Sequence, residues 1–189
     1  MALDQRIVRS RQALKDSACE LFMKNPMASL SDVAKHAGVG RATLYRHYES
    51  REQLIQELAL ESLAATEAVL APLSVLPLTS WDYLLKSLAE IMPLAEKYHF
   101  LLAVWEIASA DEDVSRMYGE QLSGLSAVVD MAKAEGAISP ALTTEWVCQL
   151  YDSVLYVGWN CVRSGSMAID EAVAHAQQTL SSGVGPTQA

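Results

Sequence analysis

The chain lacks a long hydrophobic run, although 51% of its 189 residues are hydrophobic. No stretch approaches the roughly 18 consecutive apolar residues of a membrane-spanning helix. The first residues, MALDQRIVRSRQALKD, contain no apolar segment of the signal-peptide type. These absences predict a cytoplasmic globular protein with no membrane partner. A chain of this length can form one large hydrophobic core or two modest ones.

Cysteine is also scarce, and the three cysteines, at positions 19, 148 and 161, are widely spaced in apolar surroundings. An odd number with this spacing matches neither a disulfide framework nor a zinc site, so we expect buried thiols. The four histidines lie far apart in the sequence, without metal-type spacing or an evident catalytic triad motif. We therefore expect no metal, no cofactor and no enzymatic activity.

Basic residues become rare after position 51. Up to Arg51 the sequence has nine Lys and Arg against five Asp and Glu, a net charge of +4. The rest has five basic residues against eighteen acidic ones, a net charge of −13. The overall charge of −9 therefore conceals a basic segment joined to an acidic one. Such a basic segment is typical of polyanion binding, and chance clustering on a solvated helix is the alternative.

Hydrophobic spacings of three and four residues predict helices almost throughout the chain and no strands. The first helix should end near Asn25-Pro26, because proline disfavours helical geometry in the residue before it. Ser29 can cap a second helix whose third residue is Asp32. Gly38 can end that helix in the left-handed conformation, which glycine adopts without steric penalty. A third helix then begins near Arg41.

The two glycines of AKHAGVGRATLYRHY (34–48) do not indicate a nucleotide-binding loop. A dinucleotide-binding motif needs a strand before its first glycine and a third glycine at the position of Thr43. A phosphate-binding P-loop needs a Gly-Lys-Ser/Thr sequence, which is absent. Two helices joined by a short glycine turn are instead typical of a helix-turn-helix, whose second helix enters the major groove of DNA.

The residue types that follow the turn suit DNA recognition. Arg41 can hydrogen-bond guanine, and the methyl group of Ala42 can contact the methyl group of thymine. Side chains with donors for phosphate oxygens follow: Thr43, Tyr45, His47 and Arg51. Side chains expected in the core of the three helices alternate with them: Val39, Leu44 and Tyr48.

Three of these positions have a second interpretation. Tyr45 and His47 can be half-buried packing residues instead of phosphate ligands. Arg46 can contact DNA or remain solvated.

The segments SRQALKDSACELF and SLSDVAKHAGVGRATLYRHYESREQLI resemble, without gaps from about Ser10 to Leu58, the DNA-binding domain of the TetR family of bacterial transcriptional regulators. The resemblance implies base or near-base contacts from positions 41–43 and places two serines of the second helix by the phosphates. One departure is Gly40, where the family often has a polar side chain that caps the third helix. The implied DNA-binding residues are Ser29, Ser31, Gly40, Arg41, Ala42, Thr43, Tyr45, Arg46, His47 and Arg51.

The hydrophobic spacing and the resemblance, which weakens from Glu52 onwards, together predict an all-α protein of two domains. Residues 1–51 form the helix-turn-helix domain, a fourth helix over 51–70 is the connector, and residues 52–189 form the effector-binding and dimerisation domain. Thr79 or Ser80 can cap a fifth helix that Pro93 breaks or kinks. Including further helices near 99–109, 112–134, 143–164 and 168–181, we expect about nine.

The last two predicted helices suggest a homodimer, because the helix over 143–164 carries apolar residues on more than one face. One stripe can serve the domain core and the other a partner subunit, and small residues on the last helix allow close approach. The alternative is that both stripes are buried within one subunit. The predicted interface residues are Trp146, Leu150, Val154, Val157, Cys161, Ala172, Val173, Ala176 and Leu180.

Aromatic residues and methionines are frequent on the middle helices, where the family keeps its effector pocket, although such residues also form cores. Glu106 beside Trp105 can favour a cationic ligand by cation–π attraction, and a surface charge is the alternative. The predicted pocket residues are Trp81, Met92, Tyr98, Phe100, Trp105, Met117, Tyr118 and Tyr151.

These observations predict a repressor that binds a palindromic double-stranded DNA operator as a homodimer and is released by a small-molecule effector of unspecified chemistry. Two alternatives remain within the DNA-binding class. One is a DNA-binding protein without an effector, and the other is an activator.

Overall fold

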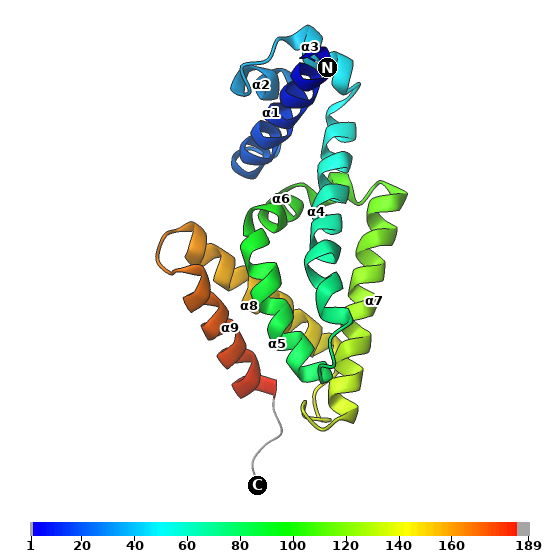
Figure 1. The fold of residues 1–189 in the computed structure, drawn as a ribbon, viewed down its shortest axis with the longest axis vertical. Helices are drawn as coiled ribbons and strands as arrows, with labels where there is room; N and C mark the ends of the chain where they lie inside the picture. Colours follow the sequence, from blue (N-terminus) through cyan, green and yellow to red (C-terminus); the bar gives the residue numbers. More distant parts are fainter. Residues whose placement is uncertain (1, 185–189) are drawn as a thin grey trace. The chain divides into compact units, whose positions relative to one another are not determined.

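The computed structural model describes residues 2–184, with side chains for residues 8–95, 97 and 99–184. All regular elements within this part of the chain are helical (Figure 1). They are α1 (Ala2–Lys24), α2 (Leu30–His36), α3 (Arg41–His47), α4 (Arg51–Ser74), α5 (Ser80–Ile91), the 3-10 helix η1 (Met92–Leu94), α6 (Ala95–Ala108), α7 (Glu112–Ala134), α8 (Thr144–Arg163) and α9 (Ile169–Val184). The predicted all-α class and the number of helices are confirmed. No described helix has both the length and the apolar character needed to cross a membrane.

Most helix ends follow the predicted signals. Thr79 caps α5 by accepting a hydrogen bond from the backbone amide of Asp82, and Pro93 lies in the 3-10 turn that follows this helix. The predicted end of the fourth helix is wrong, because α4 continues to Ser74 with Pro72 inside its last turn. Pro72 cannot donate a backbone hydrogen bond in this turn, and the burial of Leu73 keeps the turn in place.

Two compact units divide the chain. The first contains Met1–Leu63 and Glu96–Met117, and the second contains Ala64–Ala95 and Tyr118–Ala189. The boundaries of these compact units lie inside α4, at the start of α6 and inside α7, whereas the predicted functional boundary lies after residue 51. Contacts of α1 with both α4 and α6 explain this difference for the first unit. The division of DNA binding and effector binding between two domains stays a prediction.

The first unit is built around the apolar side of α1. Leu14, Ala18 and Phe22 lie four residues apart on one face of this helix, and all three are fully buried. The Phe22 ring meets the Phe100 ring of α6 at a centroid distance of 6.5 Å. Helices α1, α2 and α3 contact one another (Figure 1). We call α1–α3 the three-helix head.

The second unit is held together by the packing of α9 against α8, α5 and η1. Gly158 of α8 lies so close to the Met92 side chain that a β-carbon there would stand 2.6 Å from the terminal methyl group of Met92. The indole nitrogen of Trp159 donates to the backbone carbonyl of Met92 at 3.0 Å. These contacts fix η1 against the carboxyl-terminal half of α8.

Candidate nucleic-acid interface

A capping box fixes the start of α2. The Ser29 hydroxyl accepts a hydrogen bond from the Asp32 backbone amide at 3.2 Å, and the Asp32 carboxylate accepts one from the Ser29 amide at 2.9 Å. The hydroxyl of Ser29 also donates to that carboxylate at 2.6 Å, and these bonds hold the pKa of Asp32 below its usual value. The predicted cap is confirmed. Because Asp32 takes the hydroxyl hydrogen, a phosphate at this helix start must use backbone amides or the half-buried Ser31.

The turn between α2 and α3 depends on one glycine. Gly38 has φ +64°, a conformation that L side chains rarely adopt, and the Val39 amide donates back to the Ala34 carbonyl at 2.9 Å. Gly40, in contrast, is extended (φ −63°, ψ 141°) and supplies no side-chain cap to α3. The missing cap at Gly40 agrees with the expectation from sequence. No other group lies within 4 Å of the position of a β-carbon there, so a side chain would fit.

Helix α3 has one buried face and one outward face. Leu44 is fully buried and Tyr48, which caps the helix, is 1% exposed. Val39, the third residue expected in this core, is half-buried. The exposed side chains of α3 are four of the predicted DNA contacts: Arg41, Ala42, Tyr45 and Arg46.

Thr43 lies at the edge of the outward face and is half-buried. Its hydroxyl accepts a hydrogen bond from Nη2 of Arg46 at 3.0 Å. This contact keeps the Arg46 guanidinium along the helix and at the surface, where a phosphate can also bind it.

His47 lies at the seam between α3 and α1. Its Nε2 is 3.1 Å from the Ser10 hydroxyl, and the residue is half-buried. Burial, followed by the charges of Arg11 and Arg46, lowers its pKa below the usual value. The imidazole of His47 is therefore mainly neutral at pH 7. It packs against α1 and also lies at the edge of the outward face of α3.

Arg51 is turned into the first unit, and its side chain is only 15% exposed. Its Nε donates to the Ala28 carbonyl at 2.9 Å, and its Nη2 donates to the Pro26 carbonyl. The guanidinium also lies 4.9 Å from the centroid of the Phe22 ring. These contacts join α4 to the loop between α1 and α2. The phosphate contact predicted for Arg51 stays a prediction.

The predicted pocket residues do not come from a single unit. Tyr98, Phe100, Trp105 and Met117 belong to the first unit, and Trp81, Met92, Tyr118 and Tyr151 belong to the second. The side chain of Tyr98 lies outside the described residues. Phe100 is fully buried against Phe22. The other first-unit members with described side chains, together with Trp81 and Tyr118 of the second, are half-buried. Effector binding by this set stays a prediction.

The second unit has polar groups in its interior. Met92 is fully buried and Tyr151 is 3% exposed, and the Tyr151 hydroxyl is 2.6 Å from the hydroxyl of buried Ser87. Burial raises the pKa of Asp152, one residue further along α8, to about 6. Burial, and to a smaller extent the Asp152 charge, raises the pKa of Tyr118 on α7. Sequence reasoning missed Asp152, because an isolated acidic residue in a helix gives no signal of its burial.

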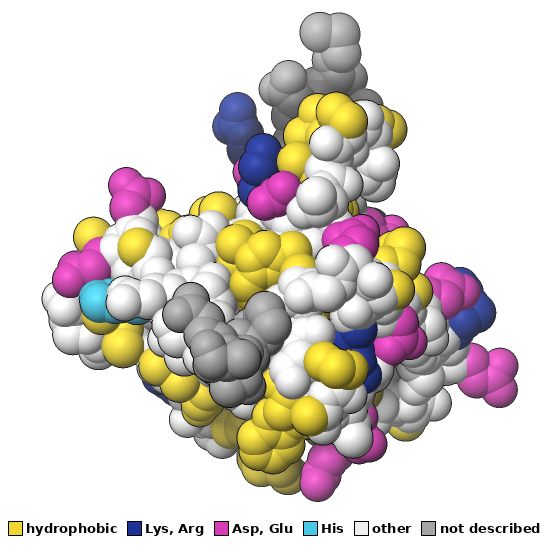
Figure 2. Space-filling model, turned by 90° about the horizontal axis from the view of Figure 1, so that it is seen from below, with side chains coloured by type: hydrophobic (Ala, Val, Ile, Leu, Met, Phe, Trp, Pro, Cys, Tyr) yellow, Lys and Arg dark blue, Asp and Glu magenta, His cyan; other side chains and the backbone are white. Residues whose placement is uncertain are grey.

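Helix α8 has an apolar face that is partly exposed in the single chain. Val157 is 59% exposed and Trp146 is 62% exposed, and Leu150 and Cys161 are half-buried. Val154 is buried at the edge of this face. Acidic side chains and separate hydrophobic areas are visible on the molecular surface in Figure 2.

Three predicted interface residues of α9 have a different position. Ala172, Ala176 and Leu180 are buried within the single chain, whereas Val173 is half-buried. A β-carbon placed on Gly158 would lie 3.7 Å from the Ala172 methyl group, which shows how closely α9 approaches α8. The small side chains of α9 therefore serve packing inside the second unit. The outward face of α8 is left as the predicted dimer contact.

No group of three or more His, Cys, Asp or Glu residues suited to a metal ion occurs among the described residues. The cysteines at 19, 148 and 161 are free thiols. Cys148 is buried, as expected for all three, but the other two are half-buried.

The helical head, its glycine turn and the outward face of α3 define a class, the helix-turn-helix DNA-binding proteins. Comparison with known proteins makes this class specific. Residues 14–58 match the family model "Bacterial regulatory proteins, tetR family". This match shows that a segment of about a quarter of the chain is similar to the amino-terminal part of TetR-family regulators. Its relatives in sequence and fold are regulators and not enzymes.

The sequence relationship is confined to a short segment. The HTH-type transcriptional repressor LfrR of Mycolicibacterium smegmatis is 43% identical over 51 residues, which are 27% of this chain and 27% of LfrR. The similarity thus spans about a quarter of either protein.

The fold relationship extends over nearly the whole chain. The crystal structure of LfrR from Mycobacterium smegmatis in complex with proflavine has a TM-score of 0.71 at 22% identity, covering 93% of this chain and 96% of LfrR. The structure of the ketosteroid transcriptional regulator KstR2 of Mycobacterium tuberculosis has a TM-score of 0.79 at 17% identity, covering 94% and 95%. At sequence identities of 22% and 17%, these comparisons show that the fold is shared and nothing further.

Replacement of Arg51 by alanine tests whether this residue has a structural role. Arg51→Ala removes two hydrogen bonds from a charged donor and the contact with Phe22, so the free energy of unfolding should fall by about 1–3 kcal/mol. Urea denaturation followed by circular dichroism measures this. Arg46→Ala, which removes an exposed arginine, is the control and should change stability by no more than about 0.5 kcal/mol. Equal stabilities of the two variants would show that the carbonyl contacts of Arg51 contribute nothing.

Proposed function

We propose that this protein is a transcriptional repressor that binds a palindromic operator as a homodimer and leaves it when a small molecule binds. The observation that carries the DNA-binding step is the exposed face of α3, where Arg41, Ala42, Tyr45 and Arg46 point away from buried Leu44. Arg41, at the first position of the helix, supplies a bidentate donor for guanine, and the Ala42 methyl group suits thymine. Tyr45, Arg46 and Thr43 supply phosphate contacts that fix the register.

A dimer follows from the small size of this surface. Helix α3 has seven residues and places few side chains on base edges. Two copies related by a two-fold axis double these contacts on a palindromic site, with half-sites separated by about 34–36 Å or a multiple. The exposed apolar face of α8, which includes Trp146 and Val157, is the surface that we assign to the contact between subunits.

For the effector we propose an organic cation. LfrR, which shares this fold, has been crystallised with proflavine, a planar aromatic cation. In this chain Asp152 has no hydrogen bond or ion pair to another described side chain, and its charge contributes to the raised pKa values of Tyr118 and Cys148. A partly buried carboxylate near an aromatic side chain favours a ligand with delocalised positive charge. Glu106, the acidic residue that the sequence suggests for binding a cationic ligand, is exposed.

Release from DNA then follows from linkage. A ligand that binds more tightly to a conformation with altered spacing of the two heads must weaken operator binding by the same factor. A regulator without an effector, or an activator, shares the DNA-binding step and differs only in this response.

Substitution of Arg41 separates base reading from phosphate binding. Arg41→Ala should weaken operator binding by about 1–3 kcal/mol and relax base preference at one position of each half-site. Tyr45→Ala, the control, should weaken binding to all duplexes to a similar extent. Selection from a random duplex pool followed by fluorescence anisotropy at fixed salt measures both effects. An equal loss of affinity for every sequence in Arg41→Ala would contradict the base contact.

A charge on the outward face of α8 tests the dimer. Val157→Asp should convert the protein to a folded monomer, because a carboxylate is costly to bury in an apolar interface. Leu102→Asp on α6 is a matched control, since Leu102 and Val157 are each 59% exposed. Sedimentation equilibrium should give a dimer for the wild type and for Leu102→Asp. Dimers in all three proteins would remove α8 from the interface.

Replacement of Asp152 tests the site proposed for the effector. The pKa of this carboxyl is raised to about 6, so its charged form destabilises the folded state. This loss of stability grows between about pH 4 and pH 6 and stays constant above pH 6. Asp152→Asn should therefore raise the free energy of unfolding by about 1–3 kcal/mol at pH 7.5 and leave it unchanged near pH 4.

The same variant should lose the increase in melting temperature that proflavine gives the wild-type protein. Glu106→Gln, which removes an exposed acid, should keep that increase. Equal stabilisation of wild type and Asp152→Asn by proflavine would exclude Asp152 from the effector site.

A further inference from the structure

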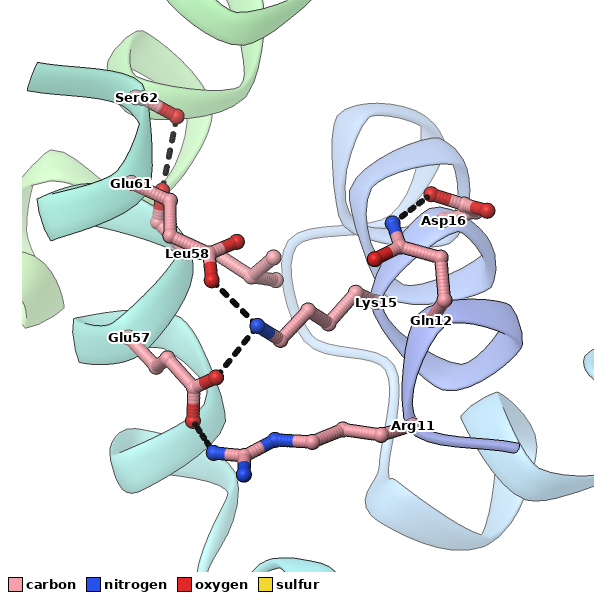
Figure 3. Close-up of polar contacts among 8 residues, drawn as sticks. All are labelled: Arg11, Gln12, Lys15, Asp16, Glu57, Leu58, Glu61 and Ser62. Atoms are coloured by element: carbon pink, nitrogen blue, oxygen red, sulfur yellow. Dashed lines mark hydrogen bonds and ion pairs between the residues drawn. The ribbon is translucent and has the colours of Figure 1, made fainter. Parts of the chain in front are cut away.

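Two helices of the first unit are joined by a cluster of four charged side chains (Figure 3). Nη2 of Arg11 is 2.7 Å from Oε2 of Glu57, and Nζ of Lys15 is 2.5 Å from Oε1 of the same carboxylate. Lys15 also pairs with Glu61. Each oxygen of Glu57 on α4 therefore has its own cation on α1.

The centre of the cluster is partly shielded from water, and Lys15 and Glu57 favour each other's charged form. The side chains of Lys15 and Glu57 are 11% and 25% exposed. Burial alone raises the pKa of Glu57, but hydrogen bonds from Lys15 and Arg11 outweigh it and hold the pKa below its usual range. Burial lowers the pKa of Lys15, and the two carboxylates reverse this effect. Ion pairs of such low exposure are screened less by salt than pairs on an open surface.

The contacts of the cluster continue to the carboxyl end of α3. The Arg11 guanidinium lies 5.7 Å from the centroid of the Tyr48 ring. Tyr48 is the carboxyl-terminal cap of α3, and its amide donates to the Leu44 carbonyl at 2.9 Å. The charge of Arg11 also acts on His47, the last residue of α3. A chain of direct contacts thus runs from Glu57 through Arg11 to the residue that ends α3.

We infer that Glu57 is a positioning residue for sequence-specific DNA binding: it holds α1 on α4 and, through Arg11 and Tyr48, fixes the orientation of α3. This inference rests on the proposed DNA-binding function. Base reading needs side chains held close to one geometry, whereas sequence-independent attraction needs only positive charge. Loss of Glu57 therefore acts mainly on the discrimination between operator and other DNA.

Glu57 has a second effect through the charges that it neutralises. In its absence Arg11 loses its only carboxylate partner among the described residues, while Lys15 keeps Glu61. A freed Arg11 next to the end of α3 can bind a phosphate and release one more counterion. The slope of log affinity against log salt then becomes steeper by about 0.9 for that contact. A residue that only stabilised the fold would leave this slope unchanged.

The test compares Glu57→Gln with two matched controls in the full-length protein. Asp16→Asn removes the same charge from an exposed position of α1, where the carboxylate accepts only from Gln12 in Figure 3. Glu61→Gln removes the other carboxylate of the cluster without touching Arg11. Affinities for the selected operator and for a scrambled duplex are measured by fluorescence anisotropy between 50 and roughly 200 mM salt.

For Glu57→Gln we expect the ratio of operator affinity to scrambled-duplex affinity to fall about 5-fold to 100-fold, the discrimination that one base pair carries. The salt slope on the scrambled duplex should steepen by about 0.9. Both controls should keep the wild-type ratio within about twofold and the wild-type slope. Arg11→Gln breaks the link to Tyr48 but leaves Lys15 paired, so it should lower the affinity ratio without a steeper salt slope. If Glu57→Gln does not fold, the affinity ratio of Arg11→Gln tests the inference.

The outcomes separate the two proposals. A wild-type protein with no preference for any duplex contradicts the proposed function, and the inference falls with it. A wild-type protein that prefers its operator, together with Glu57→Gln and Arg11→Gln variants of unchanged ratio, overturns the inference alone.

Discussion

A helix of seven residues is not stable by itself in water, where isolated helices shorter than about 12–15 residues are marginal. Helix α3 is such a helix, and every property assigned to the DNA-binding surface depends on how the rest of the first unit holds it. Leu44 anchors its inner side in the core, Gly38 sets the turn that leads into it, and Tyr48 closes its end beneath Arg11. The outward residues can then keep one orientation without contacts of their own.

The positive charge of the amino-terminal segment serves two purposes. Arg41 and Arg46 are exposed and available to an anion. Arg11, Lys15 and Arg51 are held by carboxylates or backbone carbonyls, so they join helices to one another. A charge count does not distinguish these groups, because the difference lies in which atoms each side chain can reach in the folded unit.

The two parts of the chain are related to known regulators in different ways. Sequence similarity to LfrR covers 27% of the chain, whereas the fold is shared over 93% of it. A short helix and a glycine turn allow few residue types at each position, because Gly38 needs its left-handed conformation and Leu44 its place in the core. A helical body needs only hydrophobic faces of the right period, which many sequences provide.

The sequence by itself determined the helices, the cap at Ser29, the left-handed turn at Gly38 and the outward positions of α3. These depend on spacing and on the local chemistry of one or two residues. Only the tertiary structure decided that α4 passes Pro72, that Arg51 faces inward, that Ala172, Ala176 and Leu180 of α9 pack inside one chain, and that Glu57 binds Arg11 and Lys15. Each of these depends on residues that are distant in the sequence or on burial, and local spacing does not show which distant side chains folding brings together.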